Sequence, residues 1–443
     1  MIKDILNEDL FNILKKASNI LKENKYVRVL AHYDGDGVSS SIILLKTLER
    51  LDIKYHSGYI KNLDNEGFRE LYDEEPDVLN IIVDAGSSQA QSIADYEKFI
   101  ILDHHFYSKS DVKGININAR DYGINGTREA CGATMAFIFS LVIDENNKDL
   151  FPFFMAGVIA DKQDIGGLSG LNKALYDNYN TYPTKHVLNF EGNIKDGITY
   201  SLDPFFINLS GYPDKVGAFL SKNNIDSNKS VMELTTDDNK LLGNLLSLKM
   251  LENNVGMDAI KYLESDILYF DDLGFSSKEL NSIIDGNSRT ANQSVPVQYF
   301  LGDKSVENDM LNNVKIYKTK LIDYIYRANS EIKEEKYLRY FYSPESEMAG
   351  PISGALELYA MKPDKPVIGF NSGSDDIKIS SRGTKTLVSR GLNLSLVMKE
   401  ACEKAGGSGG GHDIAAGGVI PQGKEKIFID AANNIIKLQL KSI

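Results

Sequence analysis

The sequence predicts an α/β protein with three parts: a parallel, doubly wound N-terminal domain, a mostly helical connecting region ending in a long linker helix, and a smaller C-terminal α/β domain. Three observations predict this fold class. Short apolar runs alternate with helical patterns over about the first 165 residues. A stretch with weaker patterns and many charges follows, and short apolar runs return in about the last hundred residues.

The composition limits the function classes that we consider. The 443 residues suit two or three domains at about 150 residues each. No apolar run approaches the ~20 residues of a membrane span, and the N-terminus does not resemble a secretory signal, so we expect a cytoplasmic protein. A net charge of −13 argues against a broadly basic surface. Cys131 and Cys402 form no C-x-x-C pair, so we expect neither disulfides nor a zinc knuckle.

The N-terminal domain is expected to hold four strands, each followed by a turn or a helix. Apolar or alternating runs predict the strands at residues 26–31, 53–60, 78–83 and 99–102. Helical spacing predicts helices at 4–24 and 38–48. Two strongly apolar segments, 130–142 and 150–160, predict buried helices.

The rest of the chain is expected to be helical and then α/β again. From about 170 to 305 the patterns are weak, and 306–336 predicts one long helix. Strands are expected at 337–342, 366–370 and 376–380, and a helix at 394–404 that leads into a glycine tract. The resulting domain limits are 1–195, 196–336 and 337–443.

Acidic and imidazole side chains follow three of the predicted strands and one of the buried helices. Because the carboxyl ends of parallel strands meet at one edge of a sheet, the groups that follow the strands should converge. Several carboxylates at one place repel one another unless divalent ions or large pKa shifts intervene. A mixed carboxylate and imidazole set suits Mn²⁺ better than Ca²⁺. The residues concerned are His32, Asp34, Asp36, Asp84, Asp103, His104, His105 and Asp161.

The order of these motifs resembles a known family. H-Y-D-G-D-G, V-D-A-G, D-H-H and G-V-I-A-D, with G-G-G-H-D-I-A-A-G far downstream, resemble the DHH/DHHA1 phosphoesterase superfamily. Within it, the chain is most similar to RecJ-like single-strand-specific exonucleases of the archaeal type that associates with the replisome and GINS.

The resemblance implies roles for individual residues. It implies two bound divalent ions, Mn²⁺ first and Mg²⁺ as the alternative, and a catalytic pair formed by His105 at the scissile phosphate and Asp84 as the bridge between the ions. Asp103 would orient a ligand. His32 stands two residues before the first motif aspartate, whereas in several branches the histidine stands four before it, so a ligating and an orienting role both stay open. The implied metal ligands are His32, Asp34, Asp36, Asp84, His104 and Asp161.

Substrate binding is expected from two other regions. In the glycine tract, the backbone of Gly409, Gly410 and Gly411 next to His412 could form a phosphate-binding nest. Just upstream lies a basic stripe of Lys378, Arg382, Lys385 and Arg390, whose Arg382 lies in a stretch that resembles the family's serine-arginine motif. Asn287-Ser-Arg289 resembles an asparagine-and-arginine element of RecJ-like proteins, and it makes Arg289 a further candidate.

The expected function is exonucleolytic hydrolysis of single-stranded DNA or RNA to mononucleotides, in DNA replication or repair, by a two-metal mechanism. GINS or other replisome proteins are candidate partners, and no membrane is expected. Two alternatives stay open. One is a phosphodiesterase of short oligonucleotides or cyclic dinucleotides, and the other is a replisome scaffold with little or no catalysis. The polarity of digestion, the choice between DNA and RNA, the physiological metal and the oligomeric state are not predicted.

Overall fold

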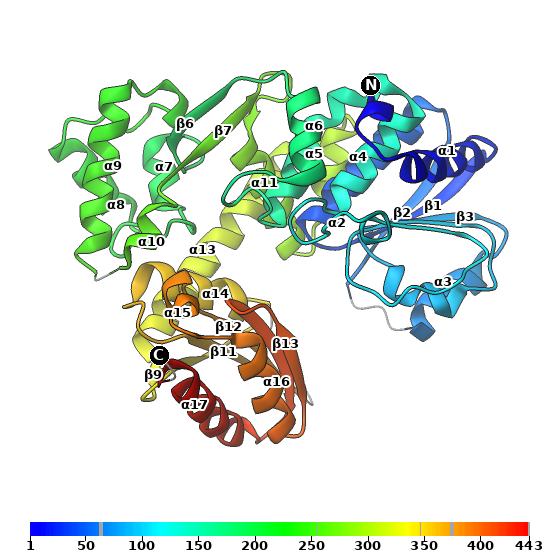
Figure 1. Cartoon of the computed structure of the whole chain (residues 1–443). Helices are drawn as coiled ribbons and strands as arrows, with labels where there is room; N and C mark the ends of the chain where they lie inside the picture. Colours follow the sequence, from blue (N-terminus) through cyan, green and yellow to red (C-terminus); the bar gives the residue numbers. More distant parts are fainter. Residues whose placement is uncertain (62–64, 254, 346, 373–375, 442–443) are drawn as a thin grey trace. The chain divides into compact units, whose positions relative to one another are not determined.

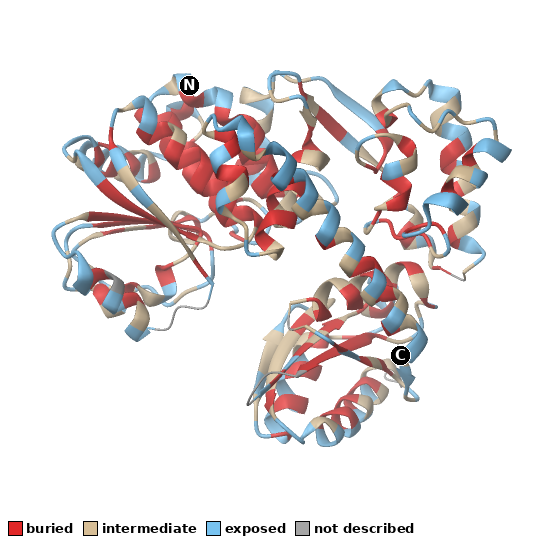
Figure 2. Ribbon diagram, turned by 180° about the vertical axis from the view of Figure 1, so that it is seen from behind, coloured by how far each residue is buried: buried red, intermediate tan, exposed pale blue. Residues whose placement is uncertain are grey.

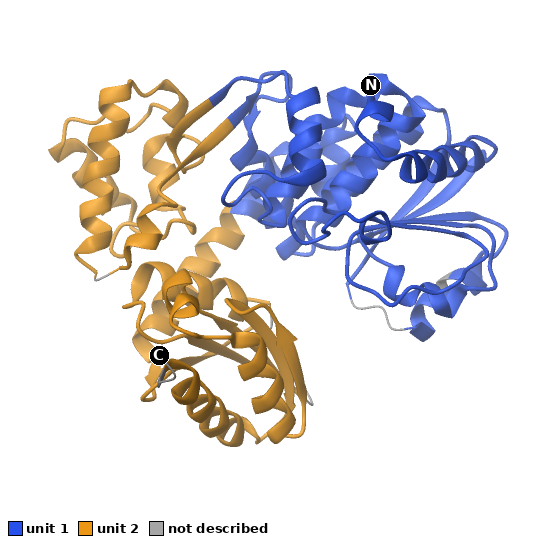
Figure 3. Ribbon diagram, in the orientation of Figure 1, with its two compact units in different colours: residues 1–184, 268–314 blue, residues 185–267, 315–443 orange. Residues whose placement is uncertain are grey.

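A computed structural model describes residues 1–61, 65–253, 255–345, 347–372 and 376–441 (Figure 1). By internal packing the chain forms two compact units. Unit 1 holds residues 1–184 and 268–314, and unit 2 holds residues 185–267 and 315–443 (Figure 3). The domain limits expected near residues 195 and 336 rest on sequence patterns rather than on packing, and they stay predictions.

Unit 1 is built on a five-stranded sheet in the order β2-β1-β3-β4-β5. All four neighbouring pairs are parallel, so the predicted parallel doubly wound fold is confirmed. Strand order reverses at β1, which places a topological switch point at its carboxyl end. The strands are β1 (Tyr26–His32), β2 (Lys54–Ile60), β3 (Leu79–Val83), β4 (Phe99–Asp103) and β5 (Ile115–Asn118).

Both faces of this sheet are covered. The strands β3 and β4 are buried along their whole length (Figure 2). Alternate strand residues such as Val29 and Ile81 belong to a large core built with the helices, whereas Leu30 and Ile82 belong to a smaller core on the other side. Every residue of α4 is buried, as its apolar sequence predicts. The helices of unit 1 are α1 (Glu8–Lys22), α2 (Gly35–Arg50), α3 (Asn65–Glu74), α4 (Gly132–Ile143), α5 (Phe151–Ala160), α6 (Gly170–Tyr179), α11 (Ser277–Arg289) and α12 (Ser294–Phe300).

The middle region is mostly helical, as expected, but it also contains a small sheet of β6 (Thr184–Leu188), β7 (Glu264–Phe270) and β8 (Phe275–Ser276). After this sheet the chain returns to unit 1, where α11 packs against α2 and α5. The predicted long helix is α13 (Glu307–Glu331). The other helices are α7 (Ile194–Thr199), α8 (Pro213–Lys222), α9 (Thr236–Leu251) and α10 (Met257–Ile260). In the described part of the chain, no helix is both long and apolar enough to span a membrane.

The C-terminal part of unit 2 contains a six-stranded sheet in the order β13-β14-β12-β11-β10-β9. Helix α14 packs on β11 and β12, and α16 packs on β13 and β14. The strands are β9 (Lys333–Glu334), β10 (Arg339–Ser343), β11 (Val367–Ser372), β12 (Asp376–Arg382), β13 (Ser408–Gly411) and β14 (Ala415–Pro421). The helices are α14 (Ala349–Ala355), which continues as one π-helical turn at Leu356–Ala360, α15 (Lys385–Ser389), α16 (Leu394–Lys404) and α17 (Glu425–Lys441).

The glycine tract is an edge strand rather than a nest-shaped loop. Residues Ser408–Gly411 form β13 and pair antiparallel with β14. A Cβ atom at Gly418 would lie 2.4 Å from the Sγ of Cys402 on α16, and one at Gly409 would lie 3.0 Å from the same sulfur. The glycines therefore let α16 lie directly on the sheet, and the predicted conformation of the tract is wrong.

Candidate metal centre

The side chains predicted to converge do so at the carboxyl edge of the unit 1 sheet. His32 ends β1, and Asp34 caps α2 by accepting a hydrogen bond from the Gly37 N–H at 3.1 Å. Asp84 follows β3 directly and takes a positive φ of 60°. Asp103 ends β4, and Asp161 caps the C-terminus of the buried helix α5.

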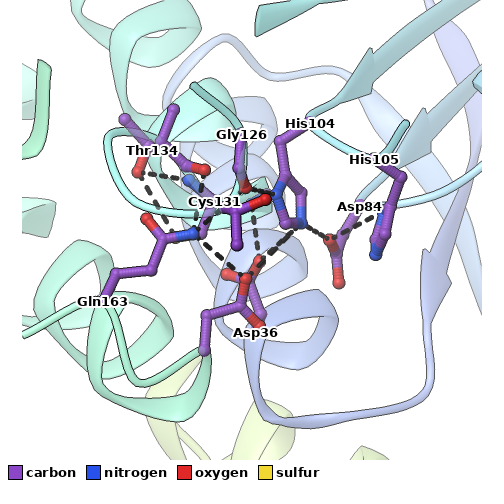
Figure 4. A network of polar contacts seen from close by, with 12 residues as sticks. Asp36, Asp84, His104, His105, Gly126, Cys131, Thr134 and Gln163 are labelled. Atoms are coloured by element: carbon purple, nitrogen blue, oxygen red, sulfur yellow. Dashed lines mark hydrogen bonds and ion pairs between the residues drawn. The ribbon is translucent and has the colours of Figure 1, made fainter. Parts of the chain in front are cut away.

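Among the described residues, three overlapping groups of potential metal ligands lie here, and two of them contain neither Asp103 nor His105. In the first, the Nδ1 of His32 lies 3.0 Å from the Oδ2 of Asp34 and 3.6 Å from the Oδ2 of Asp84. In the second, the Nε2 of His104 lies 3.6 Å from the Oδ2 of Asp161 and 3.7 Å from the Oδ2 of Asp36. Figure 4 shows His104 and Asp36 side by side. Each group gathers one imidazole and carboxylates, the donors that Mn²⁺ and related ions accept.

Asp84 lies between the two groups. Its Oδ2 faces His32, whereas its Oδ1 lies 3.1 Å from the Nε2 of His104. The Asp84 side chain is 1% exposed, and a Cβ atom on Gly132 would lie 2.4 Å from the Asp84 Cβ. Glycine at position 132 therefore leaves the space that the Asp84 carboxylate occupies.

Backbone groups hold the second group in place. The carboxylate of Asp36 accepts hydrogen bonds from the Gly132 N–H at 2.5 Å and the Ala133 N–H at 2.8 Å, at the N-terminus of α4. The Nδ1 of His104 lies 2.5 Å from the carbonyl oxygen of Gly126. A carbonyl oxygen only accepts, so the proton lies on Nδ1, and in the neutral imidazole Nε2 presents its lone pair to the carboxylates.

Asp103 organises the D-H-H segment. Its Oδ2 accepts from the Ser87 N–H at 3.0 Å, and its Oδ1 accepts from the backbone N–H groups of His104 and His105 at 2.7 and 3.1 Å. The same Oδ1 lies 2.8 Å from the Nδ1 of His105. Asp103 belongs to a third group of possible ligands with Asp84, His104 and His105. Since N–H donors already occupy both of its oxygens, the geometry suits an orienting role.

The carboxylates crowd one another. Burial and the charge of Asp84 raise the pKa of Asp36 to about 8, and burial and the charge of Asp36 raise the pKa of Asp161 to about 7. Burial alone would lower the pKa of His32, but the adjacent Asp34 and Asp84 carboxylates raise it to about 10. These shifts are the response of like charges that are buried close together.

The donor set fits divalent ions. Although two carboxylates lie near it, the buried Nδ1 of His32 makes no hydrogen bond of good geometry among the described residues. A ligand atom that is buried, unbonded and next to carboxylates is expected where a metal completes the site. Six side chains, from both groups and Asp84, could hold two ions.

Two family models match this chain. The model of the DHH family N-terminal domain matches residues 26–160, and the model of the DHHA1 domain matches residues 337–438. An uncharacterized protein of Methanocaldococcus jannaschii is 30% identical over 442 residues, which cover 95% of this chain and 96% of the relative. The chain belongs to the DHH family. The expected resemblance to the DHH/DHHA1 phosphoesterases is confirmed at this level.

Solved structures show the same fold as this DHH protein. RecJ of Thermus thermophilus in complex with Mn²⁺ superposes with a TM-score of 0.58 at 16% identity, over 96% of this chain. The DHH protein matches 55% of the length of that RecJ. CDC45 of Entamoeba histolytica superposes with a TM-score of 0.58 at 12% identity, over 97% of this chain and 98% of its own. At such identities the likeness is one of fold.

The predicted substrate-binding residues lie in both units. Arg289, at the end of α11, belongs to unit 1, and its Nε lies 3.2 Å from the Oδ1 of Asp285. Burial would raise the pKa of Asp34, but His32 and, more weakly, the charge of Arg289 hold it below its ordinary range. The structure of the DHH protein thus has a cationic side chain close enough to act on the first group.

Arg382, Gly409, Gly410, Gly411 and His412 belong to unit 2. The Nη1 of Arg382 donates to the Ser381 carbonyl at 2.9 Å, and a Cβ atom on Gly350 would lie 3.3 Å from its Nη2. Burial lowers the pKa of Arg382, and no carboxylate of the described residues lies within ion-pair distance of it. Gly410 pairs with Gly417, which pairs with Ser380, so this stretch of the sheet carries only small side chains.

One supporting residue was missed from the sequence. The Nε2 of Gln163 donates to the carbonyls of Gly126 and Ala130 at 3.2 and 3.0 Å, and its Oε1 accepts from the Nδ2 of Asn172 at 2.7 Å. Gln163 thereby fixes the carbonyl that orients His104 (Figure 4). No sequence signal marks Gln163, because its role comes from a loop that returns to the site.

Proposed function

We propose that this DHH protein is a metal-dependent exonuclease that releases mononucleotides from single-stranded nucleic acid, in DNA replication or repair. The observation that carries the proposal is Asp84, whose two oxygens face two separate groups of potential metal ligands. A carboxylate so placed suits a bridge between two ions, the arrangement used for in-line displacement at phosphorus. In this proposal Asp84 and His105 are the catalytic pair.

The residues would act in distinct ways. Bound divalent ions would neutralise charge that develops on the phosphate and would lower the pKa of a water molecule. His32 and Asp34 would hold one ion, Asp36, His104 and Asp161 the other, and Asp84 both. The Nδ1 of His105 is held by Asp103, which leaves Nε2 free to donate to a phosphate oxygen. Burial opposes protonation of His105, but Asp103 raises its pKa and so favours the donating form.

Mn²⁺ is the ion we propose, with Mg²⁺ as the alternative. The imidazole nitrogens of His32 and His104 suit Mn²⁺, and RecJ of Thermus thermophilus is described in complexes with either ion. In unit 1, Arg289, near Asp34, would contact a phosphate of the nucleic-acid strand.

The DHHA1 domain would bind the sugar-phosphate backbone of the nucleic-acid strand. Arg382 supplies a cation that no described carboxylate neutralises. Gly409, Gly410 and Gly411 form a β-strand without side chains, next to the exposed His412. A phosphodiester chain could closely approach the side of this β-strand that faces away from α16, where a Cβ atom at Gly410 would meet nothing within 4 Å. Replacing Arg382 by Ala should raise KM for a nucleic-acid strand. It should also reduce the slope of the logarithm of the binding constant against the logarithm of the salt concentration by about one.

One assay tests the proposal. Single strands of DNA and of RNA, labelled at the 5′ or the 3′ end, are incubated with Mn²⁺, with Mg²⁺ or with a chelator. We expect metal-dependent release of mononucleotides that Asp34→Ala and His105→Ala abolish. Hydrolysis of dinucleotides or cyclic dinucleotides alone would replace this proposal by the short-oligonucleotide alternative. Unchanged release by both variants would refute the assigned site.

A second candidate is a replisome scaffold, favoured by the CDC45 fold that covers 97% of this chain. GINS or another replisome protein would be its partner. The set of potential metal ligands argues against a purely structural role. A scaffold would release no mononucleotides under any metal condition, and Asp84→Asn would still bind its partner.

A further inference from the structure

One aromatic ring is exposed directly beside the site. Phe106 follows His105 in the chain, and it is 79% exposed. Of the 19 phenylalanines, all of which lie in the described residues, it alone is exposed. A single exposed apolar side chain is common on protein surfaces and carries little meaning alone. The hydrogen-bonded neighbours of Phe106 and the adjacent Arg120 point to a binding role for this ring.

The residues on both sides of Phe106 are hydrogen-bonded to other parts of unit 1. His105 is tied to Asp103 through both its backbone N–H and its Nδ1. On the other side, the hydroxyl of Tyr107 donates to the Oδ2 of Asp121 at 2.6 Å. The ring is therefore presented from a segment whose position is fixed before any ligand binds, which lowers the entropy lost on binding.

A cation lies against this ring. The guanidinium carbon of Arg120 is 5.8 Å from the centroid of the Phe106 ring. Arg120 is itself fixed, because its Nε donates to the His104 carbonyl at 3.0 Å and its Nη2 donates to the hydroxyl of Thr127 at 2.9 Å. The contact is a cation–π interaction, and the large exposed fraction of the ring leaves other surface open.

We infer that Phe106, positioned by Arg120, is a stacking platform for a nucleobase of the strand whose phosphate lies at His105. This inference rests on the proposed function and adds a base-binding site to it. Aromatic rings bind every base by stacking without reading its identity, so the platform would favour strands with unpaired bases over other phosphodiesters. In a duplex, the faces of the bases are already stacked on their neighbours.

Steady-state kinetics test the platform. Phe106→Ala should raise KM for a single strand on the order of tenfold, and kcat should stay within about twofold. Phe106→Trp should restore KM. On a strand whose terminal nucleotides at both ends are abasic, wild type and Phe106→Ala should have equal KM. Tyr26→Ala is the matched control, because Tyr26 is 40% exposed at the opposite end of β1.

A binding measurement separates this inference from the proposed function. Strands carry 2-aminopurine at the 5′ end, the 3′ end or an internal position, and stopped-flow mixing with Mn²⁺ records quenching before any release. Quenching that Phe106→Ala removes supports the platform, even where no nucleotide is released. Equal quenching by both proteins, a loss of kcat with unchanged KM, or an equal defect on abasic strands would overturn it. A protein that releases nucleotides but shows no quenching would overturn the platform alone.

Discussion

The Oδ1 of Asp103 accepts the Nδ1–H of His105 at 2.8 Å, and it also accepts the backbone N–H groups of His104 and His105. One buried carboxylate thus sets both the main chain and the imidazole that follow it. Burial would raise the pKa of Asp103, but His105 and His104 hold it below its ordinary range, so the carboxylate is charged at neutral pH.

Asp103→Asn should separate orientation from metal binding. The NH2 of the new amide group would face N–H donors, either that of Ser87 or those of His104 and His105. The neutral side chain would also no longer favour the protonated, donating form of His105. We expect kcat to fall about 10- to 100-fold, with little change in the Mn²⁺ concentration that gives half activity. Steady-state kinetics over a Mn²⁺ titration measure both values. A large loss of Mn²⁺ affinity with normal kcat at saturation would instead indicate that Asp103 binds the ion.

Asp84→Asn should remove the link between the two groups. The amide keeps the shape of the side chain but offers one oxygen in place of two. We expect the Mn²⁺ stoichiometry, measured by calorimetry, to fall from two to at most one, and activity to fall about 100- to 10,000-fold. Asp95→Asn, at an exposed carboxylate of the same unit, should change neither value. Two ions bound by Asp84→Asn would contradict the bridging geometry.

Metal affinity should rise with pH. Asp36 and Asp161 have pKa values raised to about 8 and about 7, and an ion binds these carboxylates only after their protons leave. We therefore expect Mn²⁺ to bind more tightly at about pH 8.5 than at about pH 6, with protons released on binding. Calorimetry in buffers of different ionisation enthalpy measures the proton release. Affinity independent of pH over this interval would contradict the crowding of the two carboxylates.

The metal-free protein should show the opposite pH dependence in stability. Asp36 and Asp161 have raised pKa values in the folded state, so the contribution of each is fully present below its ordinary pKa of 3.8 and is lost as pH rises toward 8. The pKa of His32 is raised from 6.5 to about 10, so the stability that this residue contributes is also lost as pH rises above 6.5. With a chelator, Tm should fall between about pH 6 and about pH 8.5, and Mn²⁺ should raise Tm most at the higher pH. A rising Tm in chelator would contradict the assigned shifts.

Glu357, on the π-helical turn of unit 2, should lower stability at neutral pH. It is 1% exposed, and neither carboxylate oxygen has a hydrogen-bond partner among the described residues. Burial raises its pKa well above the ordinary value, so stability is present below pH 4.5 and is lost as pH rises. Glu357→Gln should stabilise the protein by about 1 to 3 kcal/mol at about pH 8 and by little at about pH 5. Urea unfolding measures this, with the exposed Glu400→Gln as control.

The core of the candidate site was predictable because its signal is local. Asp84 and Asp103 each stand where an apolar run stops, and parallel strands bring such positions to one edge. The strand β5 was missed, because Ile115–Asn118 is only four residues long and half polar. The return of α11 to unit 1 was also missed, since it depends on packing between segments that are distant in the sequence.

The support around the ligands was harder to predict. Gly132 acts by leaving room for the Asp84 carboxylate. Gln163 donates to the carbonyl of Gly126, and that carbonyl orients His104. Such roles leave no periodicity and no motif. Stacking at Phe106 is of the same kind, because its exposed ring differs from a core ring only after the chain has folded.

Because the glycine tract forms the edge strand β13, its glycines are constrained by their neighbours, unlike those of a flexible linker. A Cβ atom at Gly409 would meet the carbonyl oxygen of Met398 at 2.7 Å, whereas one at Gly410 would meet nothing within 4 Å. Neighbouring glycines that look equivalent in the sequence therefore differ in the side chains that the fold can accept. A side chain should be tolerated at Gly410, whereas a Cβ atom at Gly409 or Gly418 would meet both α16 and a backbone carbonyl of the neighbouring strand.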